Sequence, residues 1–219
     1  MKNFVLLPNR QALNAIEMLE KAYPNQGYYL NFSNPLELMV AAMLSAQTRD
    51  TVVNSVTPAL FKRYRTAKDY GSAKEAELLS YIEKVTFASN KVNNIIKTAN
   101  LLSDRYRGKV PDRMEELLSL PGVGRKTANT ILINAYEKVE GIPVDTWVIK
   151  LAGRIGLSKS QKPDDIEKDL MSLLDKRHWK KIAYIFKEHG HEICHSTSPL
   201  CSKCILKDVC PKNGVTDSK

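Results

Sequence analysis

Ten consecutive residues, 120–129, carry the strongest chemical signal in this sequence. They read Leu-Pro-Gly-Val-Gly-Arg-Lys-Thr-Ala-Asn. Pro121 ends a short helical pattern, and Gly122 and Gly124 predict a tight turn with positive φ before a second helix begins. Backbone amides in such a turn and in the first turn of the next helix suit a phosphate, and Lys126 ends the turn. The pattern favours a phosphate-binding helix-hairpin-helix over a turn that only joins two packed helices.

The four cysteines of the chain are Cys194, Cys201, Cys204 and Cys210. Secreted disulfide frameworks spread their cysteines along the chain, whereas a tight cluster favours a metal over free thiols in a loose tail. Zinc ribbons pair two Cys-x-x-Cys hooks, but this chain has one close pair flanked by two more distant thiols. That spacing favours a four-cysteine cubane iron–sulfur cluster, with zinc as the alternative. Because residues 196–208 include few large apolar side chains, metal ligation would be their main source of order.

The overall composition adds a second constraint. The chain has 219 residues, with 33 Lys and Arg against 24 Asp and Glu, so that the net charge is +9. This excess predicts a polyanionic partner, although a basic surface without a specific site gives the same charge. The apolar run 4–7 is too short for a signal peptide, and the run 38–44 is too short for a membrane span. We therefore expect a cytoplasmic protein with no membrane contact and no transit peptide.

Helical periodicity runs through nearly the whole chain, and no stretch alternates as a strand does, so the predicted fold class is all-α. Asn34 and Asp112 are expected to cap helices, with Glu37 and Glu115 as their partners three residues on. The expected helices cover residues 8–23, 34–45, 52–65, a segment opening at 72–75, 92–102, 112–120, 127–136, 146–154, 163–174 and 179–188.

The helix-breaking segments between these helices suggest two helical lobes. The first is expected to span 28–136, with the hairpin at about 112–136. The second combines 1–27 with 141–219, and its cysteine loop covers 194–210.

One more motif, Pro143-Val144-Asp145-Thr146, completes a resemblance. With the hairpin and the cysteine spacing, it makes the chain similar to the endonuclease III family of base-excision DNA repair glycosylases, from residue 45 to Cys210. The resemblance implies a six-helix bundle that carries the hairpin and an iron–sulfur lobe made from both chain ends, with a DNA-binding cleft between them. It also implies a 4Fe–4S cluster held by the four cysteines, and a monomer that binds double-stranded DNA containing damaged bases or abasic sites near the nucleoid.

The resemblance makes Lys126 the catalytic nucleophile and Asp145 the catalytic carboxylate. As the damaged base leaves C1′, a carboxylate stabilises positive charge on the sugar, and an amine then holds the sugar as a Schiff base. β-Elimination breaks the strand 3′ to the abasic site. A helix of roughly 15 Å followed by eight residues that span about 26 Å lets the chain return toward Lys126. The simpler role for Asp145 is a helix N-cap before Trp147, and it can serve both.

The same resemblance assigns residues to the DNA interface. A glutamine fills the gap left by the flipped base, an apolar residue wedges beside the opposite base, and further residues contact the lesion or phosphates. These are Gln47, Phe87, Asp50, Arg49 and Lys91, together with Gly122, Val123, Gly124, Arg125 and Thr127 of the hairpin. From sequence alone, Phe87 can equally belong to the core, and Arg49 and Lys91 can be ordinary surface residues.

Three features depart from the family pattern. Trp147 replaces the usual histidine after Val-Asp-Thr, residues 86–88 read Thr-Phe-Ala instead of Gly-hydrophobic-Tyr, and the loop 194–201 has no Lys or Arg. The leading hypothesis is a bifunctional glycosylase and abasic-site lyase for oxidised pyrimidines. The alternatives are removal of thymine or uracil opposite guanine, or a non-catalytic DNA-binding module. An adenine-specific mismatch enzyme is disfavoured because that branch has no lysine at the position of Lys126.

Overall fold

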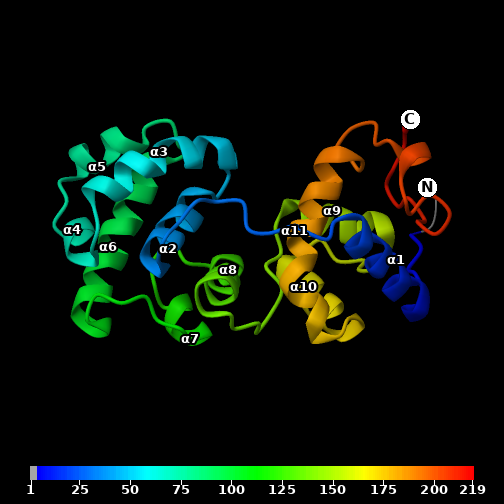
Figure 1. Cartoon of the computed structure of the whole chain (residues 1–219), viewed down its shortest axis with the longest axis horizontal. Helices are drawn as coiled ribbons and strands as arrows, with labels where there is room; N and C mark the ends of the chain where they lie inside the picture. Colours follow the sequence, from blue (N-terminus) through cyan, green and yellow to red (C-terminus); the bar gives the residue numbers. More distant parts are fainter. Residues whose placement is uncertain (1–3) are drawn as a thin grey trace. The chain divides into compact units, whose positions relative to one another are not determined.

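The computed structural model describes residues 4–219, which form eleven α-helices and one short 3-10 helix without any β-strand in that range (Figure 1). The predicted all-α class is confirmed. These residues divide into two compact units. One is Tyr29–Glu140, and the other joins the described residues up to Tyr28 with Gly141–Lys219. None of the described helices is long and apolar enough to cross a membrane.

The unit 29–140 is built around α2 and α6. Every residue from Leu38 to Leu44 in α2 is buried, as expected for a helix that is apolar on all sides. Helix α6 packs against α2, α4 and α5, and α8 packs against α2 and α7. The helices of this unit are α2 (Pro35–Leu44), α3 (Asp50–Arg63), α4 (Ala67–Gly71), α5 (Glu75–Ile82), α6 (Ala88–Tyr106), α7 (Met114–Leu118) and α8 (Arg125–Tyr136).

Two local predictions for this unit differ from the structure. The unit has a seventh helix, α4, which begins with a capping box between Thr66 and Asp69. Asp112 does not cap α7, because this helix begins only after Arg113. The Asp112 carboxylate instead accepts a hydrogen bond of 2.6 Å from the Lys138 ammonium. This ion pair links the segment before the hairpin to the segment after α8.

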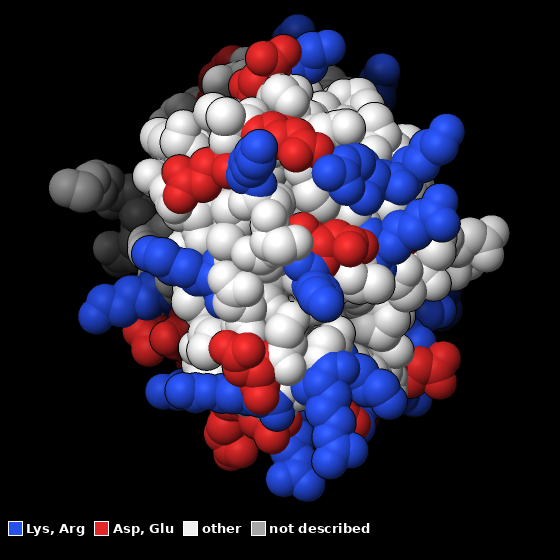
Figure 2. Space-filling model, turned by 90° about the vertical axis from the view of Figure 1, so that its left-hand side faces the viewer, with Lys and Arg blue, Asp and Glu red and all other residues white. Residues whose placement is uncertain are grey.

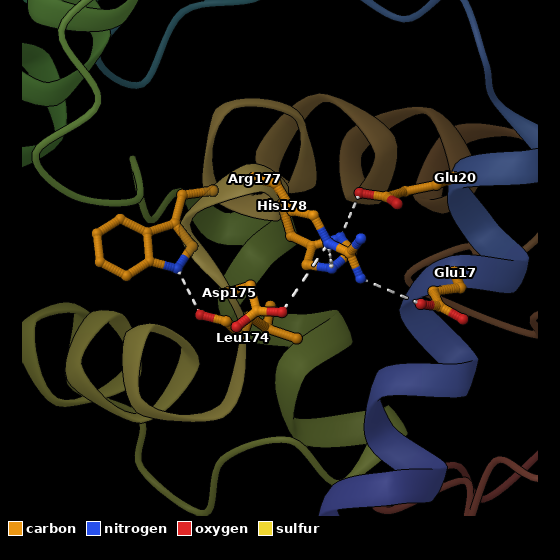
Figure 3. Close-up of polar contacts among 7 residues, drawn as sticks. Glu17, Glu20, Leu174, Asp175, Arg177 and His178 are labelled. Atoms are coloured by element: carbon orange, nitrogen blue, oxygen red, sulfur yellow. Dashed lines mark hydrogen bonds and ion pairs between the residues drawn. The ribbon is translucent and has the colours of Figure 1, made fainter.

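The second unit packs α1 (Asn9–Ala22) from the start of the chain against helices from its last third. These are α10 (Pro163–Leu173) and α11 (Lys176–Glu192), and α9 (Thr146–Ile155) packs against both of them. Polar contacts join α1 to α11 (Figure 3). The buried His178 places Nδ1 2.8 Å from the Glu20 carboxylate. Its Nε2 accepts from Arg177, which also reaches Glu17 at 3.6 Å.

Candidate functional site

The hairpin turn between α7 and α8 depends on Gly122, whose φ of +77° lies in the left-handed region. A Cβ at this position would lie 3.0 Å from the Cβ of Asn94 and 3.1 Å from the Cε of Met43. Thr98 on α6 donates a hydrogen bond of 2.8 Å to the carbonyl of Pro121 and so anchors the turn. The positive φ predicted at Gly122 is therefore confirmed, and a close packing contact adds to the need for glycine.

Gly124 behaves differently from Gly122. Its φ is −92°, so the predicted positive φ is wrong at this position. It is the N-cap of α8 and provides no side-chain cap, which leaves the positive end of the helix dipole without a capping side chain. Helix α8 begins at Arg125, two residues earlier than predicted. Lys126 lies in its first turn and is half-buried.

Asp145 is the N-cap of α9, as the simpler interpretation predicted. Its Oδ1 accepts hydrogen bonds of 2.9 Å from the amides of both Trp147 and Val148. Neither bond uses Oδ2. Asp145 lies in the unit that contains Gly141–Lys219, whereas Lys126 lies in the unit Tyr29–Glu140.

Trp147 is wedged tightly within its unit. Gly190 on α11 lies so close that a Cβ there would clash with the indole ring of Trp147. The ring of His191 lies 4.8 Å from the Trp147 ring, and the Lys150 ammonium lies 4.6 Å from its centre. The side chain beside Asp145 is thus fixed by packing, by ring contact and by a cation–π interaction.

Gln47 and Phe87 stand at corresponding places in two neighbouring loops. Gln47 lies between α2 and α3, and Phe87 directly precedes α6. Both have φ near +55°, which is uncommon for residues other than glycine. Gln47 is exposed, and the Phe87 side chain is 59% exposed, so Phe87 is not a core residue. Thr48 and Thr86 join the two loops, because the Thr86 amide donates to the Thr48 hydroxyl at 3.2 Å.

Lys91, expected as a phosphate contact, is instead buried with 8% of its surface exposed. Its ammonium donates to the carbonyls of Leu44 at 2.7 Å and Ala46 at 2.6 Å, and to the Thr48 hydroxyl at 3.1 Å. Three acceptors use the three N–H donors of an ammonium. Burial lowers the pKa of Lys91 to about 8, so the charged form still dominates at pH 7. The phosphate-contact assignment is therefore wrong for Lys91.

The remaining predicted interface residues are spread over the first turns of two helices in the same unit. Arg49 is the exposed N-cap of α3, and Asp50 begins that helix. Val123 is buried, Arg125 is exposed and Thr127 is half-buried. On the face seen in Figure 2, basic side chains are numerous but acidic ones lie between them. The positive charge on that face is therefore not gathered into one continuous patch.

In the other unit, the four cysteines form no disulfide and line one hollow, which contains about 390 Å³ of atom-free space, including some open to solvent. Within residues 4–219, no three His, Cys, Asp or Glu side chains converge closely enough to hold one metal ion. The thiols thus surround the hollow instead of meeting at a point. Burial raises the pKa of Cys204, and it raises that of Cys210 to about 11.

Sequence reasoning missed the residue that holds the cysteine loop. The Arg154 guanidinium donates to the carbonyls of Cys194, His195 and Ser196 at 2.7–3.1 Å, and to the Cys194 sulfur at 3.3 Å. No local pattern links it to a loop forty residues away. The buried His189 places Nε2 3.4 Å from the Cys204 sulfur. The Leu206 amide donates to the Cys204 sulfur at 3.4 Å. Four sulfurs around one hollow, two of which accept hydrogen bonds from N–H groups, fit the ligand set of an iron–sulfur cluster.

Comparison with known proteins places these features in a family. Residues 40–176 match the model of the HhH-GPD superfamily of base excision DNA repair proteins. Endonuclease III of Synechocystis is 40% identical over 202 residues, which cover 92% of each chain. The chain belongs to the endonuclease III family. Endonuclease III of Bacillus subtilis is 34% identical over 215 residues, or 98% of each chain.

Solved structures agree with this family membership. A trapped covalent intermediate of an endonuclease III with DNA, containing an estranged adenine, superposes with a TM-score of 0.91. It is 36% identical and covers 94% of this chain and 97% of its own. A non-covalent endonuclease III–DNA complex gives the same values. A thermostable thymine-DNA glycosylase shares the fold with a TM-score of 0.80 at 18% identity.

Proposed function

We propose that this member of the endonuclease III family removes oxidised pyrimidines from duplex DNA and then cleaves the strand at the abasic site. The observation that carries the proposal is the match to endonuclease III over more than nine-tenths of the chain. In this chain, Lys126 lies in the first turn of the helix that follows the hairpin. Its substrate is double-stranded DNA that contains a damaged base or an abasic site. Such a substrate implies that the enzyme works at the chromosome, in the cytoplasm.

Asp145 and Lys126 perform the two chemical steps. The Asp145 carboxylate is oriented by two amide hydrogen bonds to Oδ1, so that Oδ2 can face the positive charge that develops on the sugar. The base leaves with the electrons of the C1′–base bond and takes up a proton, and the neutral Lys126 amine bonds to C1′. The C1′–O4′ bond of the sugar then opens, O4′ receives the proton released by the amine, and nitrogen and C1′ form a Schiff base. The iminium acidifies the C2′ hydrogen, whose removal expels the 3′ phosphate and breaks the strand.

The duplex must release the damaged base before this chemistry begins, which costs a few kcal/mol. Gln47 fills the gap, and the exposed Phe87 ring wedges beside the opposite base. The amides of the hairpin at Gly122 and Gly124 and the first turn of α8 bind a phosphate of the damaged strand. The Val123 amide instead donates to the Leu120 carbonyl at 3.1 Å and so closes the turn.

The cysteine site belongs to a 4Fe–4S cluster. Cys194, Cys201, Cys204 and Cys210 provide the four thiolates around a common hollow. When bound, the cluster supplies iron–thiolate bonds that fix the loop 194–210. The positive charge of iron offsets the burial that otherwise favours the neutral thiols. Arg154 holds the backbone of the same loop in place by three hydrogen bonds to its carbonyls.

Borohydride reduction of the enzyme on abasic duplex DNA tests the proposed chemistry. We expect covalent capture by the wild type, its loss in Lys126→Ala, and its retention in Lys97→Ala, which changes an exposed lysine on α6. A wild type that captures no DNA would favour a DNA-binding module without catalysis.

A panel of duplexes tests the substrate class. Excision of oxidised pyrimidines should exceed excision of thymine or uracil opposite guanine. The reverse order would overturn the proposed lesion preference while leaving the lyase chemistry intact.

A further inference from the structure

One buried ammonium lies beneath the two loops that present Gln47 and Phe87. Lys91 extends from the first turn of α6, and its Nζ lies within 3.1 Å of three oxygen atoms. Two are the carbonyls of Leu44 and Ala46, and the third is the hydroxyl of Thr48. All three acceptors come from the short stretch that contains Gln47.

Each of these contacts constrains a different part of that stretch. Leu44 is the last residue of α2, so Lys91 binds a carbonyl at the negative end of that helix. The Ala46 carbonyl belongs to the peptide that leads directly into Gln47. Thr48 follows Gln47 immediately. Lys91 therefore binds the backbone just before Gln47 and the side chain just after it.

The same lysine is also connected to the second loop. The Thr48 hydroxyl accepts the amide of Thr86, the residue before Phe87. The backbone amide of Lys91 donates to the Phe87 carbonyl at 3.2 Å. One residue thus links the loop of Gln47 to the loop of Phe87, through its side chain on one side and its backbone on the other.

Both presented residues need such support, because a residue other than glycine with positive φ persists only when its surroundings hold it there. Gln47 and Phe87 have φ of 54° and 56° and extend exposed side chains. We propose that Lys91 is a positioning residue for duplex opening, which sets the spacing of Gln47 and Phe87 by binding both loops from below. This inference rests on the proposed entry of those two side chains into the duplex.

Base extrusion in a duplex provides the direct test. The probe is a duplex with 2-aminopurine beside an oxidised pyrimidine, whose fluorescence rises when the neighbouring base leaves the stack. Lys91→Met keeps an unbranched side chain, one atom shorter than lysine, but removes the charge and the hydrogen-bond donors. We expect Lys91→Met to lower the single-turnover extrusion rate by about tenfold or more, because misplacement of a working group by about 1 Å can cost roughly a hundredfold in rate. Lys91→Arg, which keeps the charge and the donors, should recover part of the rate.

Single-stranded abasic DNA separates positioning from general damage to the enzyme, since no duplex has to be opened. Borohydride capture on this substrate should be the same for wild type, Lys91→Met and the control Lys97→Met. Equal extrusion by Lys91→Met and wild type would overturn the inference. So would an equal loss on single-stranded and duplex DNA, because this would indicate a purely structural role.

A second variant keeps the test decisive if Lys91→Met does not fold. Thr48→Val preserves the shape of the side chain but removes the acceptor shared by Lys91 and the Thr86 amide. It should also slow extrusion in the duplex and spare capture on single strands, and unchanged extrusion would contradict the linkage. Gln47→Ala and Phe87→Ala test the proposed function separately. If neither variant affects extrusion, those two roles fail whatever Lys91 does.

Discussion

Replacing Gly122 by alanine would test how far the hairpin depends on one backbone conformation. Its φ of +77° costs an L-residue roughly 1–2 kcal/mol in the left-handed region. The new methyl group would also meet Asn94 at 3.0 Å and Met43 at 3.1 Å. The Met43 methyl ends a flexible side chain and can move aside, whereas the Asn94 Cβ is fixed to the backbone of α6.

These terms can be combined into an expected magnitude. Overpacking adds a destabilisation of about 1 kcal/mol to the backbone strain. The lower conformational entropy of the unfolded alanine variant offsets roughly 0.4–1 kcal/mol of this loss in stability. The net loss is about 2 kcal/mol in the free energy of unfolding. For a chain of this size it corresponds to a fall in Tm of roughly 4–8 °C.

Gly124→Ala is the matched control, two residues away in the same turn. Its φ of −92° is open to alanine, and no atom lies within 4 Å of the added methyl group. We expect its stability to change by less than about 1 kcal/mol, because alanine caps a helix less well than glycine but restricts the unfolded chain. Thermal unfolding and duplex binding would be measured for both variants. Equal losses in the two would refute the assignment of the constraint to Gly122.

Three further predictions concern charged or sulfur-containing groups. Asp145→Asn keeps an acceptor for the amides of Trp147 and Val148, so it should retain its stability but lose strand cleavage. Asp145→Ala should lose strand cleavage and also about 1 kcal/mol of stability in urea unfolding. Cleavage by Asp145→Asn at the wild-type rate would show that Asp145 acts only as a helix cap. The pKa of Lys91 falls from 10.5 in a free side chain to about 8 in the folded protein. Between pH 8 and pH 10.5 the unfolded chain therefore binds more protons than the folded protein does. Across that interval, the free energy of unfolding of the wild type should rise with pH relative to that of Lys91→Met. A difference that stays flat to pH 10.5 would contradict the lowered pKa. Cys204→Ser should remove the visible absorption and the iron of the purified protein, and a colourless wild type with stoichiometric zinc would refute the cluster.

Local sequence signals predicted the structure best where a residue acts on its own helix. Asn34 caps α2 by accepting from the Glu37 amide at 3.0 Å, and Asp145 caps α9 as its spacing indicated. The box between Thr66 and Asp69 obeys the same rule, but the helix α4 that it begins has only five residues and gave too short an apolar pattern to be found. Asp112 shows the limit of this reasoning, because a distant lysine binds the carboxylate that a local rule assigned to capping.

Lys91 was misassigned because its charge was given more weight than its position. It lies one helical turn before the buried Ile95, on the apolar face of α6. A lysine on such a face is either paired or buried against carbonyls, and that periodicity was visible in the sequence. The acceptors were not, because they belong to a loop more than forty residues earlier.

The Glu20–His178 contact has a consequence for how the polypeptide matures during synthesis. The unit 29–140 is continuous and can collapse as soon as its last helix leaves the ribosome. Helix α1 is made before this unit, whereas its partners on α10 and α11 are made after it. The residues of α1 that are buried in the folded protein, Ala12, Ile16 and Leu19, therefore stay uncovered until α10 and α11 have emerged. Helix α1 is thus synthesised before unit 29–140 but packs only after that unit has been made.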